Sequence, residues 1–389
     1  MITLAIAGKP NCGKSTFFTA ATMAHAEIAN YPFTTIDANH GVAYVRTACP
    51  CRDLGVTCEV CENEVRYIPM SLIDVAGLVP EAHKGRGLGN QFLDHLRQAD
   101  AILHLIDASG GTDAEGNPVG IGEHDPLEDV GFIEHEMTMW VYGIIEKHWQ
   151  KIQRSAQQRT YSIVQAVADV FAGLGITAEQ VKDVEHELGI DLRRIGEEEL
   201  IAFCERLVRL SKPMLVVGNK ADQAPAPLLD RLAGAEVTFA SAAGELALRK
   251  AAEGGFITYH AGDGDFSINE DTKLTEAQKA GLEAVRAVMR RWGGTGVQQA
   301  IDTAVYDLLD MIVVYPVEDE HKFCDGQGRV LPDAFLMKRG STPHDLAYQV
   351  HTDIGEGFLY AVDARKKMRI KEDHVLENGD IIKIVSTRR

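Results

Sequence analysis

Residues 8–15 limit the folds open to this chain more than any other segment. They read Gly-Lys-Pro-Asn-Cys-Gly-Lys-Ser, a G-x4-G-K-S pattern between an apolar run and a helix-forming segment. Glycines in this pattern let the backbone wrap around phosphate oxygens, while Lys14 reaches the β- and γ-phosphates and the Ser15 hydroxyl coordinates Mg²⁺. A glycine-rich turn without a ligand would not need the full spacing. We therefore expect nucleotide contacts from Asn11, Cys12, Gly13, Lys14, Ser15 and Thr16.

Short apolar runs recur at the spacing of strands that alternate with helices. They cover residues 2–7, 71–75, 101–107, 214–218 and 236–240, and two more at 42–46 and 65–68 suggest a strand pair around a cysteine-rich loop. This alternation predicts an α/β fold of the P-loop NTPase type, with a doubly wound and mostly parallel sheet. Ligands bind at the carboxyl ends of such strands, so the polar residues there should converge on one site.

Helical periodicity replaces the strand pattern between residues 129 and 210. This segment predicts an α-helical insert, a hairpin of two long helices followed by shorter ones after Gly175. Helical stretches at 274–292 and 297–309 then lead out of the sheet domain. From Ile312 the pattern returns to short strands and turns, which indicates a separate C-terminal module.

Two segments can complete a Mg²⁺ site beside Ser15. Asp74 begins the sequence Asp-Val-Ala-Gly after an apolar run, where it can hold Mg²⁺ through water while the Gly77 N–H contacts the γ-phosphate. Thr34 and Thr35 lie where a switch segment is expected, and one of their hydroxyls would complete the metal shell in the triphosphate state. We assign this role to Thr35, with Thr34 as the alternative. The predicted Mg²⁺ ligands are Ser15, Thr35 and Asp74.

The sequence Asn-Lys-Ala-Asp at residues 219–222 bears on the choice of base. The Asp222 carboxylate can accept hydrogen bonds from the guanine N1–H and 2-amino group, which adenine does not offer. Asn219 can fix the loop and the base edge, and the Lys220 stem can cover the ring. A backbone N–H of Ser241 or Ala242 can reach the guanine O6. These residues predict binding of GTP and GDP, and they conflict with a small-molecule kinase that uses the same phosphate loop.

Three further segments accompany these motifs, at residues 30–37, 74–79 and 85–93. Together they resemble the Obg-like GTPases, specifically the YchF-type branch, over most of the chain. That family has an α-helical insert in its G domain and a C-terminal TGS domain, a small β-grasp module found on translation-linked proteins. The resemblance implies a first part of the G domain at 1–128, the insert at 129–210, the second part of the G domain with a helical connector at 211–311, and the TGS domain at 312–389.

Leu78 occupies the position where Ras-like proteins carry a water-orienting Gln. An aliphatic side chain cannot hold the attacking water, so slow intrinsic turnover is expected unless another group acts. The resemblance makes His83 a candidate for orienting the water, with a solvated loop histidine as the alternative. It also makes Asn11 a candidate K⁺ ligand, although Asn is an ordinary turn residue. The predicted catalytic residues are Lys14, Gly77 and His83.

Four of the seven cysteines lie within 13 residues, as Cys49, Cys51, Cys58 and Cys61. Four thiolates at this spacing can bind Zn²⁺ tetrahedrally, although the C-x-C half is tighter than in most zinc knuckles. A reduced loop with incidental thiols is the alternative, because stable disulfides are not expected in the cytosol.

The net charge of −18 argues against broad adhesion to nucleic acid, so no DNA binding is expected. Nearly all of this charge lies in residues 1–311, because residues 312–389 carry 12 basic and 13 acidic side chains. Basic residues cluster once, at residues 365–371, where they can contact RNA phosphates or form a solvated turn. No apolar run is long enough for a membrane span, and the N-terminus has no signal-peptide pattern. We expect a cytoplasmic protein.

The leading hypothesis is a ribosome-associated molecular switch in translation, driven by Mg²⁺-dependent hydrolysis of GTP. The helical insert and the TGS domain would then contact the ribosome or RNA. Two alternatives stay open. One is an Obg-like ATPase, because some YchF-type relatives prefer ATP; the other is an RNA- or protein-binding scaffold in which the nucleotide is structural.

Overall fold

The structure is a computed structural model that describes residues 1–23, 40–84, 96–158, 161–270 and 272–387. It divides into two compact units, one with Met1–Ala43 and Ser71–Ala300 and the other with Tyr44–Met70 and Ile301–Arg389. The sequence-based division placed residues 44–70 in the first part of the G domain, whereas the structure groups them with the C-terminal segment. The four predicted segments and the boundaries between them stay a prediction.

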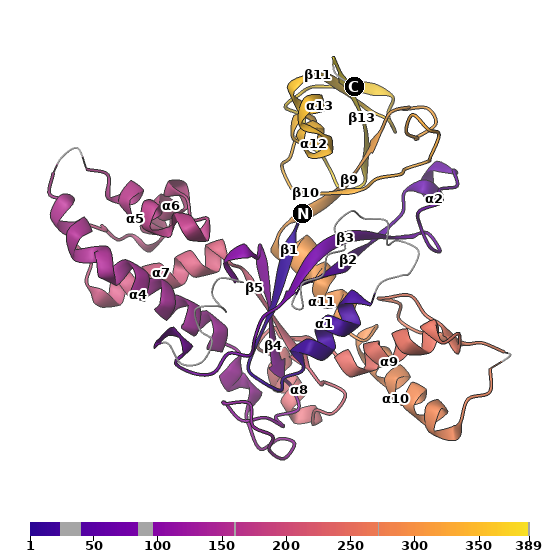
Figure 1. Cartoon of the computed structure of the whole chain (residues 1–389), viewed down its shortest axis with the longest axis horizontal. Helices are drawn as coiled ribbons and strands as arrows, with labels where there is room; N and C mark the ends of the chain where they lie inside the picture. Colours follow the sequence, from indigo (N-terminus) through magenta and orange to yellow (C-terminus); the bar gives the residue numbers. More distant parts are fainter. Residues whose placement is uncertain (24–39, 85–95, 159–160, 271, 388–389) are drawn as a thin grey trace. The chain divides into compact units, whose positions relative to one another are not determined.

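The first unit is built on a six-stranded sheet in the order β2-β3-β1-β4-β5-β6, to which the outer halves of β2 and β3 add residues of the second unit (Figure 1). The strands are β1 (Thr3–Ala7), β2 (His40–Ala48), β3 (Val65–Asp74), β4 (Ala101–Asp107), β5 (Met214–Asn219) and β6 (Thr238–Phe239). The pairs β1–β3, β1–β4, β4–β5 and β5–β6 are parallel. The predicted α/β fold is confirmed, and the carboxyl ends of the parallel strands meet at one edge.

Strand β3 is longer than predicted. The sequence suggested separate strands at 65–68 and 71–75, with Pro69 between them, and a proline usually ends or interrupts a strand. In the structure residues 65–74 form one strand, but β1 pairs with it only from Ser71 onward. Pro69 therefore lies outside the β1–β3 ladder and removes no hydrogen bond from it.

The helical segment contains α4 (Phe132–Ser155), α5 (Ile163–Phe171), α6 (Ala178–Leu188) and α7 (Glu197–Ser211). Helix α5 has only 9 residues, so the second long helix of the expected hairpin is α7, which packs along α4. A glycine with positive φ, Gly175, ends the α5 segment, and Thr177 starts α6 with a capping box.

One apolar core joins these helices to the sheet. Val141 and Ile145 of α4 and Phe203 of α7 belong to the same buried cluster as Ala5 of β1 and Ile73 of β3. The insert is therefore a continuous part of the first unit, held by burial of apolar surface.

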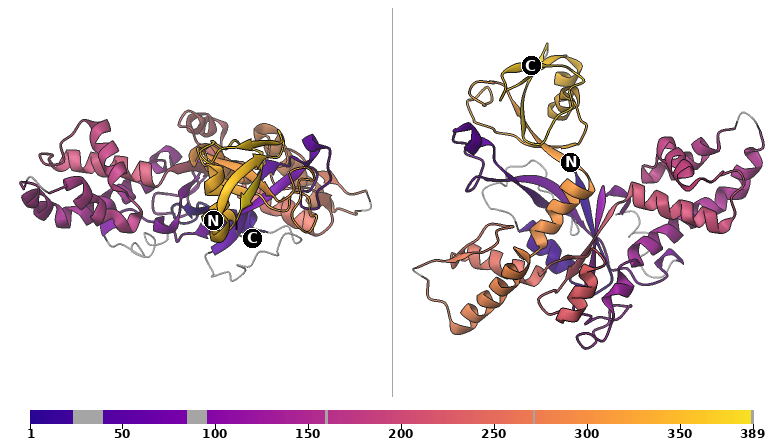
Figure 2. Two further views of the ribbon diagram at one scale, coloured as in Figure 1. Left: turned by 90° about the horizontal axis from the view of Figure 1, so that it is seen from above. Right: turned by 180° about the vertical axis from the view of Figure 1, so that it is seen from behind.

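Helix α1 (Lys14–Thr22) packs against α9 (Ala242–Glu253), and both helices lie away from the insert, with the sheet between them and it (Figures 1 and 2). The first unit also contains α8 (Ala226–Ala233), β7 (Ile257–Thr258), β8 (Ser267–Ile268) and α10 (Glu276–Trp292). Helix α11 (Val297–Thr303) begins in the first unit, and its continuation as a π-helical turn at Ala304–Leu308 belongs to the second. Within the described ranges, none of the helices is long and apolar enough to cross a bilayer.

The second unit holds a five-stranded sheet in the order β10-β9-β13-β11-β12. Its elements are β9 (Met311–Val317), β10 (Phe335–Lys338), α12 (Pro343–Val350), α13 (Thr352–Glu356), β11 (Phe358–Asp363), β12 (Met368–Ile370) and β13 (Asp380–Ser386). The central strands β9 and β13 are parallel, whereas the other pairs are antiparallel.

Both faces of this second sheet are covered. Ile312 and Val314 of β9 pack with Leu346 of α12, whereas Val313 and Tyr315 pack with the cysteine-rich segment between β2 and β3. Successive residues of a strand point to opposite faces, so the unbroken apolar sequence of β9 requires two coverings.

Replacing Phe203 with alanine should destabilise the first unit by about 3–5 kcal/mol, because it removes a fully buried ring from the core shared by the insert and the sheet. Urea unfolding followed by circular dichroism measures the effect. The matched control is Leu210→Ala, which shortens an exposed side chain of the same helix and should change stability by less than about 0.5 kcal/mol. Equal effects of the two variants would contradict a shared core.

Candidate nucleotide-binding site

The loop after β1 closes around the Lys14 side chain. Lys14 is the first residue of α1, and its Nζ donates hydrogen bonds to the carbonyl oxygens of Gly8 (3.1 Å) and Lys9 (2.9 Å). The ammonium group therefore lies inside the loop, beside the N-terminus of α1. Backbone N–H groups and the helix dipole at this end of α1 favour an anion such as a phosphate.

Ser15 and Asp74 lie together, as a Mg²⁺ site requires. Strands β1 and β3 are parallel neighbours, so the phosphate loop and Asp74 leave the sheet at the same edge. Ser15 Oγ donates a hydrogen bond to Asp74 Oδ2 over 3.1 Å. Burial raises the pKa of the Asp74 carboxyl, while the Ser15 hydrogen bond and the Lys14 charge oppose that rise. A cation beside these oxygens would favour the ionised carboxylate. Thr34 and Thr35 lie outside the described residues.

The segment that follows Asp74 lies against the phosphate loop. Gly77 approaches Pro10 so closely that an added Cβ would lie 3.0 Å from Pro10 Cγ. The Leu78 N–H donates to the Gly8 carbonyl over 3.1 Å, whereas its side chain is 3 % exposed and packs in the core shared with the insert. Leu78 is therefore a packing residue, and the position cannot orient a water molecule.

Asn219 joins the two ends of the nucleotide site. Its Nδ2 donates to the Cys12 carbonyl over 2.9 Å, and its Oδ1 accepts the Ala242 N–H over 3.0 Å. Gly13 makes this approach feasible, because a Cβ there would lie 2.2 Å from Asn219 Nδ2. The structure thus brings the predicted residues of the phosphate loop, β5 and α9 together. Asp222 lies exposed on the loop that follows β5.

The predicted contacts of Ser241 and Ala242 with the guanine O6 stay a prediction. In this structure the Ser241 N–H donates to the Thr295 carbonyl over 2.8 Å, and the Ala242 N–H is bonded to Asn219. The Ser241 hydroxyl accepts the N–H of Gly244 and caps α9. Both residues are thus fixed at the site, with protein acceptors for their own N–H groups.

Lys220 adds an ion pair beneath this loop. Its Nζ lies 2.8 Å from Oδ2 of Asp107, the last residue of β4, which is fully buried. Ser109 and Thr112 hydroxyls donate to the same carboxylate. Asp107 was not among the predicted site residues, although its position at the end of a predicted strand was a usable signal.

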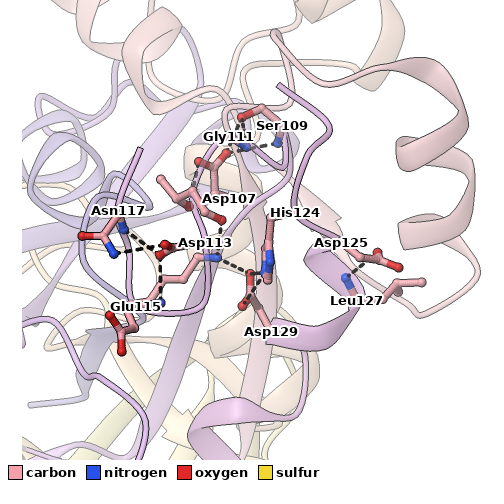
Figure 3. Close-up of polar contacts among 12 residues, drawn as sticks. Asp107, Ser109, Gly111, Asp113, Glu115, Asn117, His124, Asp125, Leu127 and Asp129 are labelled. Atoms are coloured by element: carbon pink, nitrogen blue, oxygen red, sulfur yellow. Dashed lines mark hydrogen bonds and ion pairs between the residues drawn. The ribbon is translucent and has the colours of Figure 1, made fainter. Parts of the chain in front are cut away.

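The loop between β4 and α4 supplies a second buried network that sequence patterns did not single out (Figure 3). Lys9, which is 2 % exposed, pairs with Asp129 of η2 (Pro126–Asp129) at 2.7 Å and donates to the Thr112 carbonyl at 2.9 Å. The Nε2 atom of His124 lies 3.1 Å from Asp129. Lys9 is a variable position of the G-x4-G-K-S pattern, so its role could not be inferred from that pattern.

The same loop reaches the tip of the phosphate loop. The Asn11 amide donates to the Gly116 carbonyl over 2.9 Å. Asp113 shapes the turn by accepting the N–H groups of Glu115 (3.0 Å) and Asn117 (2.8 Å) (Figure 3). Because the amide nitrogen of Asn11 is used in this way, its Oδ1 is the atom that could ligate a cation.

His83 is held by the helical insert. It belongs to a short 3-10 helix, η1 (Ala82–Lys84), and its Nδ1 lies 2.6 Å from Oε2 of Glu136 on α4. The backbone N–H groups of Glu81 and His83 donate to the two oxygens of the same carboxylate. A carboxylate at Nδ1 sets the tautomer and leaves Nε2 to act on a substrate or water. Sequence spacing did not indicate Glu136, which lies 53 residues away.

The four clustered cysteines come together in the second unit. Their Sγ atoms all lie within 4.8 Å of one another. The sulfurs of Cys49 and Cys58 are 3.7 Å apart, and Cys61 lies 3.6 Å from Cys51 and 3.3 Å from Cys58. These cysteines are not joined by disulfides. The cluster can therefore hold a metal ion.

Known families match most of the chain. Residues 3–126 match the family described as 50S ribosome-binding GTPase, residues 217–319 the G4 motif-containing domain of Obg-like GTPases of the YGR210-like type, and residues 323–386 the TGS domain. The chain is 48 % identical to an uncharacterized GTP-binding protein of Methanocaldococcus jannaschii, with 100 % of both chains covered. It belongs to the YchF-type Obg-like GTPases.

Two further proteins illustrate the range of this family. A GTP-binding protein from Pyrococcus horikoshii OT3, known from its crystal structure, shares 39 % identity and a TM-score of 0.79 over 99 % of this chain and 100 % of that one. A ribosome-binding ATPase YchF of Bacillus subtilis is 29 % identical over 98 % of each chain. The resemblance inferred from the motifs is confirmed, and the YchF-type chain is a P-loop nucleotide hydrolase.

Replacing Gly13 with alanine should weaken GDP binding at least about tenfold, because the strained φ of 98° and the clash with Asn219 would displace the phosphate loop. Titration of a fluorescent GDP analogue measures the dissociation constant. The control Gly281→Ala lies on an exposed face of α10 with open space around it and should bind GDP normally. Native affinity in the Gly13 variant would overturn the view that the missing Cβ of Gly13 is needed for Asn219 to bond the phosphate loop at Cys12.

Proposed function

We propose that this chain binds Mg²⁺ and GTP, hydrolyses GTP to GDP and phosphate, and prefers guanine over adenine. The observation that carries the choice of base is the intact Asn-Lys-x-Asp sequence, whose Asn219 bonds to Cys12 and Ala242. This tie sets the loop that carries Asp222 beside the phosphate loop. Adenine would leave the Asp222 carboxylate without its two donors, which supports GTP over the ATP named for several YchF relatives.

Asp222→Asn should remove the preference for guanine, because an amide cannot accept both hydrogen bonds from N1–H and the 2-amino group. Isothermal titration with GTP, GDP, ATP and ADP measures this, and the wild type should bind GDP at least about 10²-fold more tightly than ADP. The control Asp230→Asn alters an exposed carboxylate on α8 and should keep the preference. Tighter binding of adenine nucleotides by the wild type would favour the ATPase alternative.

We propose that Ser15, Asp74 and Thr35 hold the Mg²⁺ ion, which neutralises charge on the β- and γ-phosphates. Lys14 lies within the phosphate loop and adds a second positive charge there. The Gly77 N–H would contact the γ-phosphate. These groups lower the free-energy barrier to hydrolysis by positioning the phosphates and neutralising their charge. None of them orients the attacking water, so another residue must do so.

We propose that His83 positions that water and that Glu136 acts as its orienting partner. Burial of both side chains and three hydrogen bonds to the Glu136 carboxylate fix the imidazole against the insert. Leu78 cannot orient the water, because its aliphatic side chain is buried. A K⁺ ion near Asn11 Oδ1 would supply positive charge where other GTPases use an arginine.

His83→Ala should lower the single-turnover rate of GTP hydrolysis about 10²-fold, and Glu136→Gln about tenfold, with little change in the affinity for GTP. Quenched-flow measurement of phosphate release, in K⁺ and in Na⁺, tests both residues and the cation. The control His186→Ala removes an exposed imidazole of α6 and should hydrolyse GTP at the native rate.

Equal rates in all these variants would favour the scaffold alternative, in which the nucleotide is structural. The buried Leu78 is the observation that keeps this alternative in view. If addition of ribosomes also leaves the rate unchanged, the switch proposal fails.

We propose that the switch acts on the ribosome in the cytoplasm. The name of the Bacillus subtilis relative and the TGS domain support this partner. The turn between β11 and β12 exposes basic side chains at residues 365–367, and β12 exposes Arg369, all of which can meet RNA phosphates. Two of these basic side chains already have partners within the protein: Lys366 pairs with Asp363 at 2.9 Å, and Arg369 lies over the Tyr360 ring. The insert would provide a second contact surface.

A further inference from the structure

We infer that Cys49, Cys51, Cys58 and Cys61 bind one Zn²⁺ ion, and that this ion holds the segment between β2 and β3 in the shape that covers one face of the C-terminal sheet. The proposal concerns the second unit and does not depend on the function proposed for the nucleotide site, whose described residues all belong to the first unit.

The sulfur positions fit a single tetrahedral ion. With Zn–S bonds of about 2.3 Å, four thiolates at tetrahedral angles lie about 3.8 Å apart. Three of the six sulfur–sulfur separations are 3.3, 3.6 and 3.7 Å, and all four sulfurs lie within 4.8 Å of one another. A disulfide would need about 2.05 Å between sulfurs. In a polynuclear iron–sulfur cluster the thiolates bind different irons and are spread further apart.

The backbone holds both halves of the site in place. Cys51 begins the short helix α2 (Cys51–Leu54), and the Cys49 N–H donates to the Glu64 carbonyl over 2.8 Å. Glu62 and Val65 exchange two backbone hydrogen bonds of 2.9 and 2.8 Å, which close a tight turn directly after Cys61. The two ligand pairs therefore lie together at the tip of the segment that joins β2 to β3.

The cysteines lie in a place where a metal ion supplies structure. Cys49, Cys51 and Cys58 are 3, 5 and 8 % exposed and pack in one cluster with Tyr315 of β9 and Ile381 of β13. The segment from 49 to 61 has few large apolar side chains of its own. Segments too small to form a core commonly use a closed four-ligand Zn²⁺ site instead.

Further hydrogen bonds attach the strands on either side of the cysteines to the C-terminal part of the same unit. Arg66 is buried, and its guanidinium donates to the carbonyl oxygens of Leu331 (2.6 Å) and Pro332 (2.8 Å). The Tyr306 hydroxyl donates to the Arg46 carbonyl over 3.2 Å. These bonds attach β2 and β3 to the C-terminal segment on either side of the cysteines, and the ion fixes the tip between them. On binding, each thiol proton is released to solvent and Zn²⁺ keeps four thiolate ligands.

The test begins with the full-length protein purified without chelators. Elemental analysis should find about one zinc per chain, and mercurial titration of the thiols should release it. Cys61→Ser, which changes the most exposed ligand, should lose the zinc. The matched control Cys324→Ser removes a buried cysteine of the same unit that lies outside the cluster, and it should keep the zinc.

The structural role has its own readout. Hydrogen exchange followed by mass spectrometry should show residues 44–70 and strand β9 exchanging at least about tenfold faster in Cys61→Ser than in Cys324→Ser, with GDP affinity unchanged in both. If Cys61→Ser does not fold, Co²⁺ exchange into the wild-type protein replaces it, since tetrahedral thiolate coordination gives Co²⁺ intense visible bands. A wild-type protein that binds neither metal, contains iron instead, or forms disulfides among these cysteines would overturn the proposal.

Discussion

The hydrogen bonds of the Asn219 amide are the interaction on which the nucleotide site depends. One amide bonds the phosphate loop at Cys12 and the start of α9 at Ala242, segments more than 200 residues apart in sequence. The parallel strands bring these segments to one edge of the sheet, and the missing Cβ of Gly13 lets the amide approach. Because both ends of the amide are used, a movement of the phosphate loop would strain the hydrogen bonds that join it to β5 and α9.

Two ion pairs with buried carboxylates belong to the same site. Lys220 pairs with Asp107 and Lys9 pairs with Asp129, so two lysines are neutralised by carboxylates from the strand and loop of β4. Leaving a buried charge without its partner costs free energy, so the local fold must bring each lysine to its carboxylate. Their geometry holds the loop between β4 and α4 against the phosphate loop. The helical insert enters the same region through Glu136, which binds His83.

The second unit depends on the covering of both faces of its sheet. A central strand whose residues alternate between two buried faces needs a covering layer on each side, and the C-terminal helices provide only one. The cysteine-rich segment from the N-terminal half of the chain provides the other. This explains why residues 44–70 group with the C-terminal segment rather than with the strands that follow them.

Much of the site could be predicted because it rests on local patterns. The phosphate loop, Asp74 and Asn219 each follow a short apolar strand, and the spacing of such motifs is a property of the chain itself. The clustering of four cysteines was likewise visible in their spacing. By contrast, the order of the long helices in the insert could not be predicted, because the end of the α5 segment depends on the left-handed conformation of Gly175. The pairing of His83 with Glu136 could not be predicted either, since no local sequence rule connects these two residues.

The sequence by itself therefore determined the family, the α/β class and the phosphate-loop motif, because these follow from strand length, glycine placement and local chemistry. Only the tertiary structure decided which groups orient one another. It paired Lys9 with Asp129 and Lys220 with Asp107, buried Leu78, and placed the four cysteines on the C-terminal sheet. Such contacts join residues far apart in the chain, and they form only where packing brings their elements together.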